Sequence, residues 1–345
     1  MRSSHNIPML LIAAIPATGL SQWTYGTYGV SGTTAELRGL SVVSANVAWA
    51  SGARGTVLRT LDGGRTWHAD TVPGFTTLDF RAVHALNDGA GFIASAGEAE
   101  KELARILSTG DGGRHWHSIY STTQPGVFLD AIVFWDLRSG IALSDPVDSA
   151  FFLLLTENRG RTWTRLPPAQ LPRVLPGEAA FAASGSSIAL RGSSMAWIGT
   201  GGGGRARVMR TADRGRTWHV TDVPVHATGP AAGIFAITFF DDSVGIAVGG
   251  DYTQPRLAAT SVALTRDGGR TWRAAAASPA AYLSGVAYAG SKDRVVAVGL
   301  AGTFVSGDGG DRWTQIDTVP MNAVRFHGDA GFAVGPRGRV ARWTP

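Results

Sequence analysis

The chain has 345 residues, a formal net charge of +5 and only 17 % charged residues, and it contains 46 glycines. It has no cysteine, which excludes disulfides and thiolate metal sites, and its eight histidines show no metal-ligand spacing. Because no basic cluster is interleaved with aromatic residues, the composition does not indicate nucleic-acid binding. We therefore expect neither a nucleic-acid partner nor a metal or other cofactor.

Residues 1–19 predict a signal peptide. Arg2 and His5 precede the apolar run 9–15, and small residues occupy positions −3 and −1 if cleavage follows Gly19. Seven apolar residues are too few to cross a bilayer, so we expect no membrane span. The sequence thus predicts an exported protein, periplasmic or extracellular, with residues 20–345 as a single domain. A cytosolic tail is the alternative interpretation of the first residues.

An eight-residue pattern occurs six times: Ser/Thr, any residue, Asp/Asn, any residue, Gly, two residues, Trp. The copies occupy 60–67, 109–116, 156–163, 211–218, 265–272 and 306–313. The steps between their acidic positions, where Asn158 replaces Asp once, are 49, 47, 55, 54 and 41 residues. Such a period is typical of one four-stranded blade of a β-propeller.

The pattern has a structural explanation that needs no ligand. An Asp carboxylate can accept hydrogen bonds from backbone N–H groups and hydroxyls across a tight turn, and Gly supplies a positive φ. The Trp can cover the turn and pack between blades. We therefore predict structural roles for the six acidic or amide residues Asp62, Asp111, Asn158, Asp213, Asp267 and Asp308.

The strands follow a regular order from residue 33 onward. The first unit predicts strands at 37–44, 47–52, 56–60 and 66–71. The later units predict strands at 80–85, 91–95, 105–109 and 115–120; 131–135, 140–143, 151–156 and 162–166; 196–199; 235–240, 245–249, 262–265 and 271–275; and 285–289, 295–299, 303–306 and 312–316. A Pro-rich insertion at 166–177 precedes the fourth unit, and we expect its glycine run at 201–204 to form a turn.

A seventh unit, at 322–326, 331–335 and 339–343, ends after three strands. The N-terminal segment 22–30 can supply the fourth strand, which would close the ring and remove the exposed sheet edges. The prediction is an all-β fold, a seven-bladed β-propeller with six blades that carry the repeated turn and a seventh closed by the N-terminal strand. Six blades are the alternative.

Polar residues that depart from the repeat are the candidates for function. In a propeller, the repeated turns lie on one face, and the loops that precede first strands and follow second strands lie on the other, the top. The candidates on the predicted top face are Arg81, Glu98, Asp130, Asp145, Glu178, Asp251 and Tyr252. Such residues also form ordinary turns, but a charge near the channel mouth needs a partner or water. We expect a polar ligand site there.

The repeated turn resembles the Asp-box, or BNR repeat, of sialidase-like propellers. The phrases LRGLSVV, VAWASG and TVLRTLDGGRTW resemble the photosystem II stability/assembly factor-like subset of the WD40/YVTN/BNR-like repeat proteins. The resemblance implies a non-catalytic scaffold, expected to be a monomer, that binds a protein or polysaccharide through its top face. It carries no catalytic residues over to this chain.

A glycoside hydrolase or lyase is the alternative function. The sialidase-like relatives clamp their substrate with three arginines, and only Arg81 fits such a position here. A different glycosidase would need two carboxylates at a fixed separation, for which the candidates are Asp130, Asp145 and Glu178. Arginines that follow the repeated Asp, such as Arg65, form a second possible surface for an anionic partner.

Overall fold

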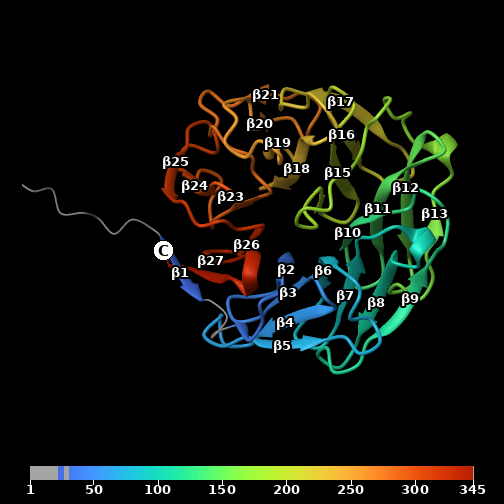
Figure 1. The fold of residues 1–345 in the computed structure, drawn as a ribbon. Coiled ribbons are helices and arrows are strands. Elements are labelled where there is room, and N and C mark those ends of the chain that lie inside the picture. The colour runs from blue at the N-terminus through green and yellow to red at the C-terminus, as the bar shows by residue number, and fades with distance from the viewer. Residues whose placement is uncertain (1–21, 27–30, 345) are drawn as a thin grey trace, which may run out of the picture.

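The computed structural model describes residues 22–26 and 31–344, and it folds into seven four-stranded antiparallel sheets around a common axis (Figure 1). We number the sheets as blades in chain order. Their strands are β2 (Leu37–Val42), β3 (Ala48–Gly52), β4 (Thr56–Thr60) and β5 (His68–Thr71) in blade 1; β6 (Phe80–Ala85), β7 (Gly91–Ser95), β8 (Arg105–Thr109) and β9 (His117–Ser121) in blade 2; β10 (Leu129–Phe134), β11 (Gly140–Val147), β12 (Ala150–Thr156) and β13 (Thr164–Arg165) in blade 3; β14 (Ile188–Arg191), β15 (Met195–Thr200), β16 (Ala206–Thr211) and β17 (His219–Val223) in blade 4; β18 (Ala232–Phe239), β19 (Gly245–Asp251), β20 (Val262–Thr265) and β21 (Arg273–Ala274) in blade 5; β22 (Gly285–Tyr288), β23 (Val295–Gly299), β24 (Gly302–Ser306) and β25 (Thr314–Asp317) in blade 6; and β26 (Ala323–His327), β27 (Ala330–Val334), β28 (Val340–Thr344) and β1 (Gln22–Gly26) in blade 7. The predicted seven-bladed propeller is confirmed.

Blade 7 is completed by the N-terminal strand. β1 pairs antiparallel with β28, from Gln22 opposite Thr344 to Gly26 opposite Val340, and Figure 1 shows β1 at the outer edge of this blade, next to the C-terminus. The prediction of this pairing is confirmed for residues 22–26, whereas 27–30 and the predicted signal peptide lie outside the described residues. The alternative of six blades is wrong because seven sheets are present.

The core lies between neighbouring blades. The second strands are largely buried, as in β3 with its sequence AWASG. Small residues alternate with large ones, so that faces of adjacent sheets can interdigitate. Trp49 of β3 has no exposed surface and contacts Trp116 of the next blade edge-on, with ring centroids 6.2 Å apart. Three single-turn 3-10 helices, η1 (Ala99–Lys101), η2 (Pro168–Gln170) and η3 (Pro336–Gly338), interrupt the loops.

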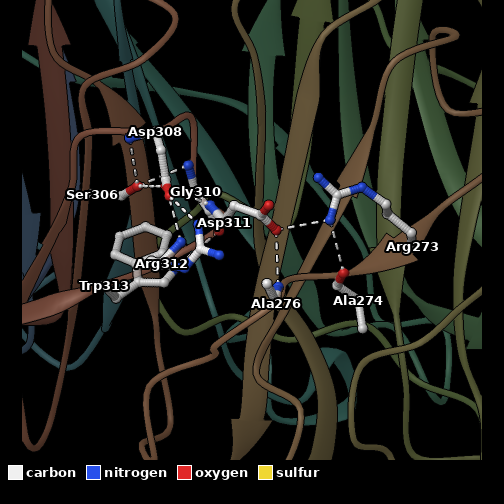
Figure 2. Close-up of polar contacts among 9 residues, drawn as sticks. All are labelled: Arg273, Ala274, Ala276, Ser306, Asp308, Gly310, Asp311, Arg312 and Trp313. Carbon is white, nitrogen blue, oxygen red and sulfur yellow. Dashed lines mark hydrogen bonds and ion pairs between the residues drawn. The ribbon is translucent and has the colours of Figure 1, made fainter.

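The six repeated turns join the third and fourth strands of blades 1 to 6. In blade 6, shown in Figure 2, the Ser306 hydroxyl donates to Asp308 at 2.8 Å and accepts the N–H of Gly310 at 2.9 Å. The same Asp308 carboxylate accepts the backbone N–H of Arg312 at 2.9 Å. The chain therefore reverses direction around one carboxylate and one hydroxyl.

The fourth strands begin about two residues later than predicted. In blade 1 the predicted strand starts at residue 66, but the N–H of Thr66 donates to the Asp62 carboxylate at 2.9 Å, and β5 begins at His68. The predicted start was wrong because the turn uses an N–H group that a sheet ladder would need. The same shift moves the last strand of blade 3 from 162 to Thr164.

The tryptophan of the repeat packs across the blade boundary in the first blade. Trp67 meets Phe332 of β27 edge-on with centroids 6.1 Å apart. Gly64, at φ +81°, lies so close to this ring that an added Cβ would come within 2.8 Å of it. Glycine is required there both for the backbone conformation and for the approach of the neighbouring blade.

Blade 4 departs from the regular pattern. Its first strand starts only at Ile188, and of the preceding residues, 180–183 lie at the top of the ring. Gly201 forms bridges with both Ala179 and Gly233, so the glycine run expected to be a turn begins as part of the blade 4–5 contact. Within the residues the structure describes, no helix has the length and apolar character needed to cross a membrane.

Candidate ligand-binding site at the channel mouth

A cavity of about 330 Å³ lies at the end of the ring where first strands begin and second strands end. This is the predicted top face. Every blade contributes to the wall, whose lining residues include Arg38, Arg81, Asp130, Asp145, Phe181, Phe235, Tyr252, Tyr282, Leu300 and Asn322. Four of the seven predicted ligand-binding residues (Arg81, Asp130, Asp145 and Tyr252) therefore meet in one cavity.

Two carboxyl groups from blade 3 lie in this wall. Asp130 of β10 is only 1 % exposed, and its Oδ2 has no hydrogen-bond partner among the described residues. Burial, followed by the nearby Asp145 carboxylate, raises the pKa of Asp130 well above its usual value, against the opposing effect of Arg81. Burial also raises the pKa of Asp145 to about 6, although its Oδ1 accepts the N–H of Ala180 at 3.0 Å.

Two arginines stand on the first strands of blades 1 and 2. The Nε of Arg81 pairs with Asp79 at 2.7 Å, and Arg38 pairs with Glu36 at 3.4 Å and donates to the carbonyl of Ala183. The Nε of Arg38 and Oδ1 of Asp79 are buried without a partner in the described part of the chain. Both guanidinium groups are thus positioned by acids, with hydrogen-bonding capacity left over for a ligand or water.

Aromatic rings form the opposite part of the wall. Phe181 stacks on Phe235 with centroids 3.9 Å apart, and Tyr282 meets Phe235 edge-on at 4.7 Å. Tyr252 packs edge-on against Phe235 at 6.1 Å and remains 49 % exposed. Burial raises the pKa of Tyr282, so its hydroxyl stays protonated. The cavity therefore combines carboxyl groups and guanidinium groups with an aromatic surface.

The other three predicted site residues do not line this cavity. Glu98 is exposed and pairs with Lys101 at 2.7 Å. Asp251 closes a turn by accepting the N–H and hydroxyl of Thr253, at 2.8 and 2.6 Å. Each is engaged by close neighbours in the sequence.

Glu178 is buried in an ion pair that the sequence does not reveal. Its Oε1 accepts Arg207 Nε at 2.8 Å and the hydroxyl of Thr200 at 2.6 Å, and its Oε2 also pairs with Arg207. The N–H of Leu175 donates to the same carboxylate at 2.8 Å. These bonds fix the Pro-rich insertion onto blade 4 and occupy the carboxylate.

Sequence reasoning missed the aromatic residues Phe181, Phe235 and Tyr282, together with Arg38 and Asn322. Asn322 Nδ2 donates to Glu36 at 2.7 Å and to the carbonyl of Leu37 at 2.8 Å, which joins blade 7 to blade 1 beside the cavity. The available signal was position, because Arg38, Phe235, Tyr282 and Asn322 lie at or near the start of a first strand, as Arg81 does. Phe181 had no such signal, since it precedes β14 by seven residues.

The repeated turns lie at the other end of the strands, and none of their acidic residues lines the cavity. The hydroxyl of Thr66, which donates to Asp62 at 2.6 Å, and its backbone N–H lower the pKa of Asp62 to about 2. The hydroxyl of Thr60 donates to the same carboxylate at 2.9 Å. In the portion of the chain described, no group of three His, Asp or Glu residues could hold a metal ion.

Solved structures with the same fold include two of YCF48. One, described as bound to D1 peptide, has a TM-score of 0.66 and 19 % identity, covering 96 % of this chain and 100 % of that one. YCF48 from Cyanidioschyzon merolae has a TM-score of 0.64 and 19 % identity, covering 94 % and 98 %. Virginiamycin B lyase from Staphylococcus aureus has a TM-score of 0.61 and 14 % identity, covering 94 % and 100 %.

No protein-family model matches the chain, and no curated protein matches it. At these identities the solved structures establish the propeller fold alone, because unrelated functions share this fold.

Proposed function

We propose that this protein is a binding or scaffold propeller whose top cavity recognises a segment of another protein. The observation that carries the proposal is one cavity, lined by all seven blades, in which a 99 % buried carboxyl group keeps an unpaired oxygen. A buried polar atom without a partner costs free energy, and a ligand that supplies the partner recovers it.

The chemistry of the wall suits a peptide. Asp130 and Asp145 can meet backbone N–H groups, and the guanidinium of Arg81 can donate to carbonyl oxygens. The exposed ring of Tyr252 offers a rigid amphipathic contact of the kind enriched in binding hot spots. The YCF48 structure described as bound to D1 peptide supports a protein partner rather than a glycan.

A peptide-display selection against the immobilised full chain tests this function. Selected peptides are then titrated calorimetrically against wild type, Tyr252→Ala and Arg81→Gln, with Arg65→Gln on the opposite face as the matched control. We expect the two cavity variants to weaken binding by about tenfold or more, which corresponds to about 1.4 kcal/mol, and the control to leave it unchanged. Selected peptides that bind all four proteins equally would refute the site.

Catalysis on a polysaccharide is the second candidate. It rests on the finding that Asp130 and Asp145 share a cavity and both have a raised pKa, as a general acid requires. Glu178 is a poor candidate for this role because Arg207 and Thr200 occupy its carboxylate. A glycan hydrolysis and elimination screen with wild type beside Asp130→Asn and Asp145→Asn separates the two functions, since a scaffold shows no turnover.

We also propose that the protein is exported and that it is related to the Asp-box propellers. The predicted signal peptide at 1–19 supports an exported location, and cell fractionation of the full chain tests it. The six repeated turns, with their shared Thr/Ser–Asp/Asn hydrogen bond, support a relationship to the photosystem II assembly factor-like proteins.

A further inference from the structure

A second cavity, of about 310 Å³, lies at the other end of the first strands. Its wall is formed by the ends of β2, β6, β10, β14, β18 and β26. Apolar side chains, among them Phe134, Phe239, Leu190 and Ile237, share the surface about equally with polar groups. The two basic side chains in this wall are His84 of β6 and Arg325 of β26, and no Asp or Glu is present in it.

Arg325 has no carboxylate partner among the described residues. Its Nη1 donates to the carbonyl of its neighbour Val324 at 3.2 Å, and no ion pair involves it in the part of the chain that is described. Burial lowers the pKa of Arg325 to about 10, with no acidic group opposing that shift. A guanidinium in such surroundings pays a desolvation cost that a bound anion would offset.

The pKa of His84 also shows that, within the described part of the chain, positive charge in this wall has no nearby carboxylate to balance it. Burial, and then repulsion from Arg325, lowers the pKa of His84 to about 4. The imidazole is therefore neutral at pH 7 and can donate one hydrogen bond without adding charge.

A smaller neighbouring cavity of about 280 Å³ shares Arg325, Thr238, Phe239 and Phe326 with the first and adds Arg191. Its wall also contains no acidic residue. Arg191 interacts electrostatically with the carboxylate of Asp241, which also accepts hydrogen bonds from the backbone N–H groups of Ser243 and Val244. Arg325 thus lines both neighbouring cavities, and arginines are the charged side chains in their walls.

We propose that this second mouth binds a monocarboxylate with an apolar body, whose carboxylate pairs with Arg325 while its body fills the space between the phenylalanine and aliphatic side chains. A planar guanidinium matches a carboxylate through two parallel hydrogen bonds. Arg325 balances a single negative charge, and the neighbouring Arg191 already interacts with the Asp241 carboxylate, so a phosphate dianion would leave one charge uncompensated. The neutral imidazole of His84 can donate a second hydrogen bond to the bound carboxylate.

The test is calorimetric titration of the full chain with 3-phenylpropionate and with its neutral amide. We expect the acid to bind at least about tenfold more tightly than the amide, because only the acid supplies charge to Arg325. A tripeptide ending in a phenylalanine carboxylate, compared with its amidated form, distinguishes a free metabolite from a protein C-terminus as the source. If acid and amide bind equally in both pairs, or none binds, the proposal is wrong.

Variants separate recognition from folding. Arg325→Gln should abolish the preference for the acid and leave the melting temperature about unchanged, since the half-buried guanidinium has no carboxylate partner to lose among the described residues. Arg325→Lys should retain part of the preference, and Arg216→Gln, an exposed arginine in a repeated turn, should retain all of it. In wild type, the acid should also raise the pKa of His84 measured by NMR, because an anion favours imidazolium. An unchanged acid preference in Arg325→Gln, or an unchanged His84 pKa, would overturn the assignment.

Discussion

The indole N–H of Trp23 donates to the hydroxyl of Thr303 at 3.1 Å, which joins positions 280 residues apart in the chain. Trp23 lies on β1 in blade 7, and Thr303 lies on β24 in blade 6. The N-terminal strand therefore does more than complete its own sheet, because it also binds the preceding blade. The pairing of β1 with β28 completes blade 7, since without β1 the β28 edge would be unpaired.

Replacing Trp23 by Ala should destabilise the protein by about 3–5 kcal/mol, the usual cost of truncating a buried aromatic residue. Its ring is 6 % exposed and packs against Trp343 at 4.8 Å. Trp23→Phe is the matched control, because it keeps an aromatic ring and loses the hydrogen bond, with an expected cost of about 1 kcal/mol. Urea unfolding measures both, and equal stability of Trp23→Ala and wild type would show that closure does not use this strand.

Asp62→Ala should lower stability by about 1–3 kcal/mol without affecting ligand binding, because it leaves the N–H and hydroxyl of Thr66 without their acceptor. Asp70→Ala, at an exposed position in β5 of the same blade, is the control and should be neutral. The pKa of Asp62 is depressed to about 2, so its contribution is present above the ordinary value of 3.8 and is lost as pH falls toward 2. Loss of binding at unchanged stability would instead make Asp62 a ligand residue.

Glu178→Ala should destabilise the protein by about 3–5 kcal/mol, because Arg207, only 7 % exposed, would be left as an unpaired buried charge. The double variant Glu178→Ala/Arg207→Met should recover much of that loss. Thermal unfolding of the three proteins decides the question. A stable Glu178→Ala variant that has lost activity on a glycan would return this residue to the list of catalytic acids.

Asp130→Asn should become increasingly more stable than wild type as pH rises above about 4. The raised pKa of Asp130 keeps its native carboxyl protonated while the unfolded chain ionises near pH 3.8, so wild type loses stability as pH rises toward the native pKa. For Asp145→Asn the same difference should level off above pH 6, because the pKa of Asp145 is about 6. Melting temperatures from pH 3 to 9 measure both, and a pH-independent difference for Asp130→Asn would mean that its carboxyl is ionised.

The propeller could be predicted because the same short turn sequence recurs in six of its blades. The repeated turn needs Thr, Asp and Gly within five positions, so neighbouring residues determine its geometry. The pairing of 22–26 with β28 could be predicted because the seventh unit lacks a fourth strand. The convergence of Arg81, Asp130 and Asp145 was also accessible, because strand position alone sets the face of the ring.

The remaining details depend on contacts between distant residues. Glu178 was placed on the correct face, but its partner Arg207 lies 29 residues later on another strand, and nothing in the spacing indicates the pair. The aromatic wall of Phe181, Phe235 and Tyr282 draws on three blades. The hollow around Arg325 likewise arises only when six first strands meet.

The central claim is that a partner binds at the top mouth while the repeated turns only support the ring. Hydrogen–deuterium exchange of the full chain, with and without a display-selected peptide, tests it most directly. The account predicts new protection at 127–131, 144–146, 179–184, 251–254 and 281–283, with no change at the repeated turns. Protection confined to 60–67, 109–116 and the equivalent turns, with none at the mouth, would contradict it.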